Sequence, residues 1–237
     1  LPETSSVETT SLELGIGVSV IGLLIASISI IPLFLSIYAG RLSDRLGIRR
    51  ALIISSNTLA TRTDLVQKAR AVLGERCVGV FHRTVPHVPR SVVFAAAEMA
   101  RQVRADGLIG FGGSTCAVTC RGVALCVAED VTTGEELDEY KVQVVDGRPV
   151  HTPEMKNPAM PIVCIPTTLS AGEYTSGGGI TNEATRQKEH YHSEQLTPRV
   201  VILDPELSLA TPDWLWCSTG IKALDHRHWP RLPSGTT

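Results

Sequence analysis

The sequence lacks the charge imbalance and the repeats that mark several large classes of protein. Its 22 lysine and arginine residues nearly balance 24 aspartate and glutamate residues, which gives a net charge of −2 over 237 residues. This balance provides neither the basic field expected of a nucleic-acid-binding protein nor an acidic tail. No internal repeat or low-complexity segment occurs. We therefore expect no nucleic-acid partner and one or two ordinary domains.

The six cysteines lack the paired spacing of a zinc site, because none forms a C-x-x-C pair. They are Cys77, Cys116, Cys120, Cys126, Cys164 and Cys217. Three of them fall within eleven residues of a stretch that we expect to be helical. This spacing favours small buried side chains in a reducing compartment over a zinc site or a disulfide framework.

Charged residues are absent from Leu14 to Ala39, a run of 26 positions. An uncharged apolar run of 18 or more residues is long enough to cross a bilayer as a helix. Acidic residues precede this run and arginines follow it, so the positive-inside rule places the downstream chain in the cytoplasm. We expect a polar segment at 1–13, a transmembrane helix at 14–39 and a membrane-anchored protein. The alternative is a buried hairpin of a soluble core, in a cytoplasmic protein.

From residue 51 onward, short apolar stretches alternate with stretches of helical periodicity. Alternation of this kind predicts an α/β fold with a doubly wound parallel sheet. A polar insertion at 135–160 interrupts the pattern. The expected strands are 51–55, 77–81, 107–111, 162–165 and 199–203, and the expected helices are 64–73, 91–104 and 115–127.

The turn from Gly110 to Thr115 leaves an expected strand and opens an expected helix. Glycine lets the backbone approach a ligand closely, while the first N–H groups and the dipole of a helix favour a pyrophosphate. A tight turn that needs positive φ would have the same composition. The order G-x-G-G-S-T also differs from the usual dinucleotide fingerprint. By itself the turn leaves both interpretations open.

Three further motifs follow in a fixed order. They are Ile165-Pro166-Thr167-Thr168 with Ser170, Gly172, Glu173 and Thr175, then Val201 to Leu207, then Ser218 to His226. With the glycine turn they resemble the iron-containing (group III) alcohol dehydrogenase superfamily, and maleylacetate reductase most of all. The family patterns are roughly G-G-G-S, P-T-T-x-x-G-S-E, V-I-x-D-P-E-L and G-[MI]-x-A-[LI]-x-H. The resemblance covers about residues 50–226. It implies the dinucleotide-binding half of a dehydroquinate-synthase-like fold.

The resemblance also implies an activity. Enzymes of this type use NADH or NADPH to reduce maleylacetate to 3-oxoadipate in the degradation of aromatic compounds. The hydride comes from the nicotinamide, and the protein supplies position and electrostatics. The expected cofactor is therefore NAD(H) or NADP(H), and the expected partner is a small-molecule substrate. Members of the family often form homodimers.

The family's roles carry over to residues of this sequence as implications of the resemblance. The cofactor phosphates would lie on the glycine turn, the threonine pair would line the cleft, and a lysine would lie near the nicotinamide ribose. Ser55, Ser56 and Asn57 would approach the adenine side. The implied cofactor-binding residues are Ser56, Asn57, Gly112, Gly113, Ser114, Thr115, Thr167, Thr168 and Lys188. Simpler roles remain open, since a threonine pair can cap a turn and Lys188 can be a solvated charge.

Two departures from the family pattern bear on the cofactor turn and on the metal. Ser114 stands where a third glycine is usual. Lys222 stands four residues before His226, where metal-dependent members carry an aspartate. An ammonium group repels a divalent cation, whereas reductases of the maleylacetate type work without metal. The resemblance therefore implies Lys222 and His226 as catalytic residues of the substrate pocket. The pairs His190-x-His192 and His226-x-His228 have ligand spacing, but we expect no metal there.

The segment from Gly40 to Arg50 resembles a different family. It matches the motif G-x-L-x-D-R-x-G-R-R/K, which follows the second transmembrane helix of major facilitator transporters. One helix cannot form a transport pathway. The alternative hypothesis is a membrane-anchored transporter fragment fused to a non-functional dehydrogenase piece, and a third is a reading frame that is not one functional protein.

The expected division of the chain follows from these two resemblances. It has the polar segment at 1–13, the membrane helix at 14–39, the basic loop at 40–50, a truncated NAD(P)-binding domain at 51–226 and an out-of-pattern tail at 227–237. The family continues beyond the segment matched by His226 with a helical domain that completes the substrate pocket. We therefore expect impaired turnover.

Overall fold

The computed structural model describes residues 47–145 and 148–228, and the side chains of 144, 148–150 and 225–228 are outside the description. The predicted membrane helix at 14–39 lies outside the described residues, as does most of the transporter-like loop. Within the two described ranges, no helix is both long and apolar enough to cross a membrane.

Five parallel strands form the central sheet, in the order β2-β1-β3-β6-β9. The strands are β1 (Ala51–Ser56), β2 (Cys77–Thr84), β3 (Gly107–Gly112), β6 (Ile162–Pro166) and β9 (Val200–Val201). Strands β1 and β3 are buried along almost their whole length, as expected for the centre of a parallel sheet that is covered on both faces. The predicted α/β fold with a parallel sheet is confirmed, although the last strand is shorter than predicted.

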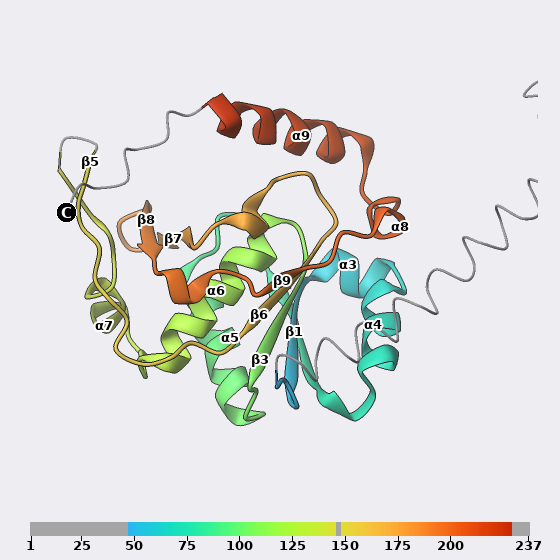
Figure 1. The fold of residues 1–237 in the computed structure, drawn as a ribbon, viewed down its shortest axis with the longest axis horizontal. Helices are drawn as coiled ribbons and strands as arrows, with labels where there is room; N and C mark the ends of the chain where they lie inside the picture. Colours follow the sequence, from blue (N-terminus) through green and yellow to red (C-terminus); the bar gives the residue numbers. More distant parts are fainter. Residues whose placement is uncertain (1–46, 146–147, 229–237) are drawn as a thin grey trace, which may run out of the picture. The chain divides into compact units, whose positions relative to one another are not determined.

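The helices between the strands cover both faces of this sheet. Helices α3 (Asn57–Arg62) and α4 (Leu65–Leu73) lead from β1 to β2, followed by the short η1 (Gly74–Arg76). Helix α5 (Arg90–Gln102) leads from β2 to β3, and α6 (Ser114–Ala128) from β3 to β6. Figure 1 shows α4 on one side of the strands and α5 and α6 on the other.

The direction of winding reverses at β1, which has β2 on one side and β3 on the other. Right-handed crossovers in opposite directions place their helices on opposite faces. The carboxyl ends of β1 and β3 are therefore a topological switch point, where ligands of open α/β sheets bind.

Helix α6 lies at the centre of the core, and ten of its fifteen residues are buried. The cysteines Cys116, Cys120, Cys126 and Cys164 are buried, as predicted, whereas Cys77 is half-buried and Cys217 is exposed. Burial raises the pKa of the Cys116 thiol to about 11. These thiols act as small apolar side chains in the core.

Two antiparallel hairpins stand apart from the central sheet. One pairs β4 (Gln143–Val145) with β5 (Arg148–His151), and the other pairs β7 (Gly177–Asn182) with β8 (Gln187–His192). Buried Arg90 of α5 donates hydrogen bonds to Asp138, Glu189 and Tyr191. It thereby joins α5 to the β7–β8 hairpin and to α7 (Gly134–Asp138).

The compact α/β unit begins at Ile48, three residues before the predicted start at 51. Ile48 is buried and lies under Gly107. The backbone N–H groups of Arg49 and Arg50 donate to the Asp106 carboxylate at 2.8–3.1 Å. The end of the segment interpreted as a transporter loop is therefore part of the amino edge of the sheet.

The last described elements cross the opposite edge. After η2 (Gly172–Tyr174) and η3 (Glu194–Leu196), the chain forms α8 (Pro205–Ser208) and α9 (Asp213–His228). Figure 1 shows α9 beyond the carboxyl ends of the strands. The Leu169 N–H donates to the Thr219 hydroxyl at 3.2 Å, which fastens α9 to the loop after β6. The tail predicted to begin at 227 is helical through 228.

Candidate functional site

Hydroxyl groups fasten the carboxyl ends of the first three strands together. The buried Ser55 hydroxyl of β1 donates to the Phe111 carbonyl of β3 at 2.8 Å. The buried Thr84 hydroxyl of β2 donates to the Ser55 carbonyl at 3.0 Å. Side-chain hydrogen bonds therefore join the three strands at the switch point.

Gly112 ends β3 in a conformation that only glycine adopts freely. Its φ is +141°, and a Cβ at this position would lie 2.8 Å from the Cys116 sulfur. Its carbonyl accepts from the Thr167 N–H at 3.1 Å, which joins the glycine turn to the end of β6. Backbone conformation and packing thus both require glycine here.

Gly113 precedes α6 and leaves the start of that helix open. No side chain caps the N-terminus of this fifteen-residue helix. A Cβ at Gly113 would meet the Thr168 side chain at 3.4–3.5 Å, which is ordinary contact. Helix N–H groups and the helix dipole attract anions. The start of α6, where Ser114 and Thr115 are half-buried, is therefore a candidate site for a phosphate group.

The predicted threonine pair lies directly beside this turn. Thr167 and Thr168 are buried. The Thr167 carbonyl accepts from the Thr211 hydroxyl at 2.7 Å, and the Thr168 hydroxyl lies 3.5 Å from that of Ser170. The structure thus brings the glycine turn, both threonines and the end of β1 to one edge.

The departure at Ser114 is matched by a second departure at Gly172, which packs on it. A Cβ at Gly172 would lie 2.8 Å from the Ser114 Cβ. The family pattern has glycine at position 114 and serine at position 172, so this chain exchanges the two. The pattern's glycine at 171 is also replaced, since Ala171 adopts a left-handed φ of +55°.

We expect the substitution Gly172→Ser to destabilise the protein, because the new side chain would overlap Ser114. Overpacking of this kind costs about 1–3 kcal/mol. Adding Ser114→Gly should restore most of the loss, and urea unfolding of the four proteins measures this coupling. Additive effects of the two substitutions would contradict the proposed exchange.

The structure shows no hydrogen bond between the glycine turn and the described side chains of the remaining predicted residues. The Ser56 hydroxyl accepts from the Leu59 N–H at 3.2 Å and so caps α3, while Asn57 is exposed. Lys188 is exposed on β8, with its methylene groups against Gly179. Lys222 is exposed on α9, and the side chain of His226 is outside the described structure. The roles of Lys188, Lys222 and His226 therefore stay predictions.

Sequence reasoning assigned no role to Arg121 or Glu173, which lie next to the turn. Both are buried, and the Arg121 guanidinium donates to the Gly172 carbonyl at 2.6 Å. Burial lowers the pKa of the Arg121 guanidinium and raises the pKa of the Glu173 carboxyl. The opposite charge of the partner favours the ionised form of each group and so acts against burial. One feature of the sequence could have pointed to Arg121, because it is the only charged residue of α6.

The described side chains include no cluster of metal ligands. No three histidine, cysteine, aspartate or glutamate side chains converge among them. His192, one of the spaced histidines, lies 2.7 Å from the Ser176 hydroxyl through Nε2.

Similarity to known proteins agrees with this geometry. Dehydrogenase FUM7 of Gibberella moniliformis is 35% identical over 180 residues, which are 75% of this chain and 42% of that protein. The maleylacetate reductase of Sphingobium indicum is 28% identical over 177 residues, 75% of this chain and 40% of that protein. The chain thus spans less than half the length of these relatives.

Solved structures agree as well. The crystal structure of maleylacetate reductase from Agrobacterium tumefaciens has a TM-score of 0.61 and 25% identity, over 81% of this chain and 44% of that chain. A crystal structure of 1,3-propanediol oxidoreductase has a TM-score of 0.66 and 25% identity, over 79% of this chain and 46% of that chain.

The comparisons do not show the transporter resemblance. The family model described as iron-containing alcohol dehydrogenase matches residues 37–205, so the segment read as a transporter loop falls inside this match. The match covers more than half of the 237 residues. The chain belongs to the iron-containing alcohol dehydrogenase family.

Proposed function

We propose that the chain binds NAD(H) or NADP(H) at the carboxyl edge between β1 and β3, as the cofactor-binding part of a reductase. The observation that carries this proposal is the open N-terminus of α6 behind Gly112 and Gly113. It lies at the switch point of a parallel sheet, where dinucleotides bind in other α/β proteins.

Support for the cofactor also comes from a protein of the same fold. Sulfoacetaldehyde reductase from Bifidobacterium kashiwanohense was crystallised in complex with NAD+, and its TM-score to this chain is 0.64 at 22% identity. That identity establishes the shared fold alone. The buried threonine pair beside the glycine turn gives the cofactor a second wall.

The proposed substrate is maleylacetate or a related unsaturated keto acid, because maleylacetate reductases are among the relatives. When bound, the nicotinamide would supply a hydride to one carbon of the double bond conjugated to the ketone, and a proton from solvent would add to the other carbon. The glycine turn and the threonines position the cofactor. Lys222 and His226 lie on α9, which crosses the same edge of the sheet.

Titration of the purified chain with NADH and with NADPH tests the cofactor, with nicotinamide fluorescence as the readout. We expect saturable binding of at least one of them. Oxidation of that cofactor should be faster with maleylacetate than with a simple aldehyde such as butanal. Absence of saturable binding would refute the cofactor site, and faster turnover of butanal would refute the substrate class.

A further inference from the structure

Arg121 is the largest fully buried side chain of the described structure, and it carries a charge. One guanidinium nitrogen, Nη2, donates to the Gly172 carbonyl at 2.6 Å. The other two nitrogens, Nε and Nη1, have no hydrogen-bond partner within the described part of the chain. Burying a charge with so few partners costs free energy, which suggests that the guanidinium has a function at this place.

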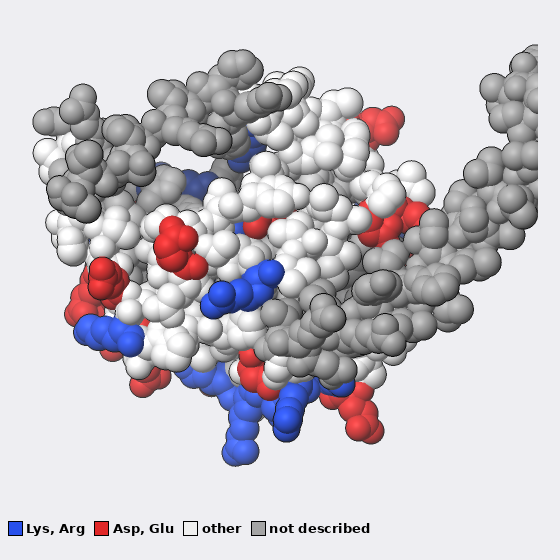
Figure 2. Space-filling model, in the orientation of Figure 1, with Lys and Arg blue, Asp and Glu red and all other residues white. Residues whose placement is uncertain are grey.

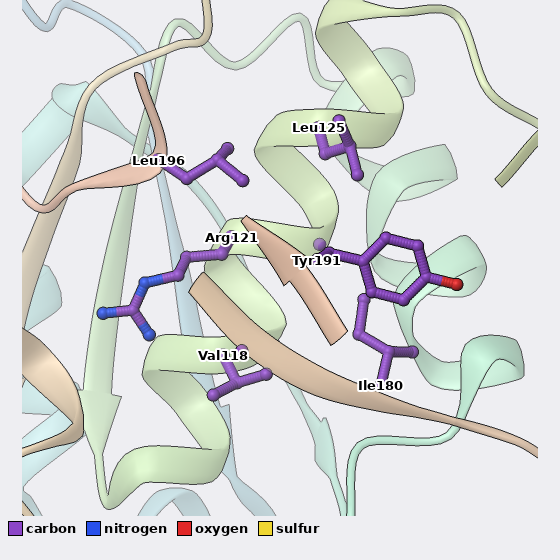
Figure 3. A pocket seen from close by; sticks show the side chains of 8 residues that line it. Val118, Arg121, Leu125, Ile180, Tyr191 and Leu196 are labelled. Atoms are coloured by element: carbon purple, nitrogen blue, oxygen red, sulfur yellow. The ribbon is translucent and has the colours of Figure 1, made fainter. Parts of the chain in front are cut away.

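The position of Arg121 connects it to the glycine turn. Helix side chains tilt toward the N-terminus of their helix, and Arg121 reaches a carbonyl in the loop that packs on Ser114, the first residue of α6. Figure 3 shows its guanidinium pointing away from the apolar side chains of Leu125 and Tyr191. The guanidinium therefore lies against the loop whose Gly172 packs on Ser114, the first residue of α6.

Glu173 brings an opposite charge to the same loop. It is 6% exposed and follows Gly172, whose carbonyl Arg121 holds. Burial raises the pKa of its carboxyl. An anionic carboxylate here opposes the binding of a phosphate, whereas the guanidinium favours it. The two side chains thus have similar burial and opposite expected effects on an anionic ligand.

We propose that Arg121 is a positioning residue of the cofactor's phosphate subsite. Its hydrogen bond holds the 170–175 loop against Ser114, and its charge adds to the dipole of α6. Phosphates bound in front of Gly113 are attracted by both. This inference rests on the proposed cofactor binding. On the face drawn in Figure 2, both acidic and basic side chains are visible.

Three variants in the full chain test the proposal through the Kd for NADH, or for NADPH if that cofactor binds better. Arg121→Met keeps the length of the side chain and removes the charge, so we expect Kd to rise about tenfold or more. Arg121→Lys keeps the charge and should remain within about threefold of wild type. Glu173→Gln removes the opposing charge and should leave Kd unchanged or lower it.

The matched control is Arg101→Met. Arg101 donates to the carbonyls of Cys126 and Val131 at the other end of α6. It should lower thermal stability and leave Kd unchanged. A merely structural Arg121 would give equal losses of affinity in the methionine and lysine variants, and that result would overturn the proposal.

The other outcomes are also decisive. If Arg121→Met does not fold, a loss of affinity in Glu173→Gln or in Arg121→Lys contradicts the proposal, and retention of affinity in both supports it. If wild type binds neither NADH nor NADPH, the proposed function fails and this inference falls with it. If wild type binds the cofactor but the Kd values of the Arg121 and Glu173 variants differ from those expected, only the role of Arg121 is refuted.

Discussion

The variant Gly113→Ala is expected to fold normally and to lose cofactor binding. The added methyl group would meet Thr168 at 3.4–3.5 Å, which the native packing accepts. The same methyl group would narrow the space between Gly113 and Thr168 at the start of α6, where the phosphates are proposed to lie. Because close approach to the first N–H groups of α6 provides the attraction, we expect Kd to rise by about a hundredfold, or about 2.7 kcal/mol.

A matched glycine variant separates the site from general effects of alanine. Gly74 lies at the end of α4 with φ +56° and open space around its Cβ position. The substitution Gly74→Ala should therefore lower stability by about 1 kcal/mol through backbone strain, with no change in Kd. Titration with NADH and thermal unfolding of both variants measure the two effects. Unchanged affinity in Gly113→Ala would place the phosphates elsewhere.

The variant Arg90→Met is expected to cause the largest loss of stability. The Arg90 side chain is 9% exposed and pairs with Glu189, which is 13% exposed, and with Asp138, which is 40% exposed. Removing one partner of a buried ion pair leaves an uncompensated charge and costs about 3–5 kcal/mol. A domain is stable by only about 5–15 kcal/mol, so this loss would remove a large part of the stability of the folded state.

The pH dependence of this effect follows from Asp138. Burial raises the pKa of its carboxyl, but the hydrogen bond and charge of Arg90 outweigh burial and lower it below the ordinary value of 3.8. A lowered pKa stabilises the folded state above pH 3.8 and loses this contribution as the pH falls through the folded value. Wild type should thus lose more stability than Arg90→Met on acidification below about pH 4.

Urea unfolding of both proteins at pH 7 and below pH 4 measures this difference, with Arg62→Met as the control. Arg62 is exposed at the end of α3, so its replacement should change stability by less than about 0.5 kcal/mol. Equal slopes of stability against pH in wild type and Arg90→Met would contradict the role assigned to the Arg90–Asp138 pair.

The central sheet was predictable because its signals are local. Strands β1 and β3 are short runs of apolar residues, and the helices after them show helical spacing, so periodicity was sufficient. The turn at Gly112 and Gly113 was predictable for the same reason, because it lies between an expected strand and an expected helix. The β7–β8 hairpin was harder, because β8 carries charged residues such as Lys188 and Glu189 that do not alternate as in a half-buried strand.

The long-range contacts could not be predicted from one sequence. Arg90 meets Glu189 across 99 positions, and Arg121 meets Gly172 across 51. Neither separation leaves a periodic signal. The comparisons do not show the transporter resemblance, which rested on a short motif taken without its surroundings. Asp106 binds the backbone of Arg49 and Arg50 from more than fifty positions away.

Amide hydrogen exchange with and without saturating NADH, or NADPH if that cofactor binds better, tests the central claim most directly. A cofactor held between β1 and β3 should slow exchange in peptides that contain Gly113 to Cys116 and Thr167 to Leu169, because those N–H groups lie at the proposed phosphate subsite. Protection confined to the β7–β8 hairpin, or no change at the glycine turn, would contradict the account.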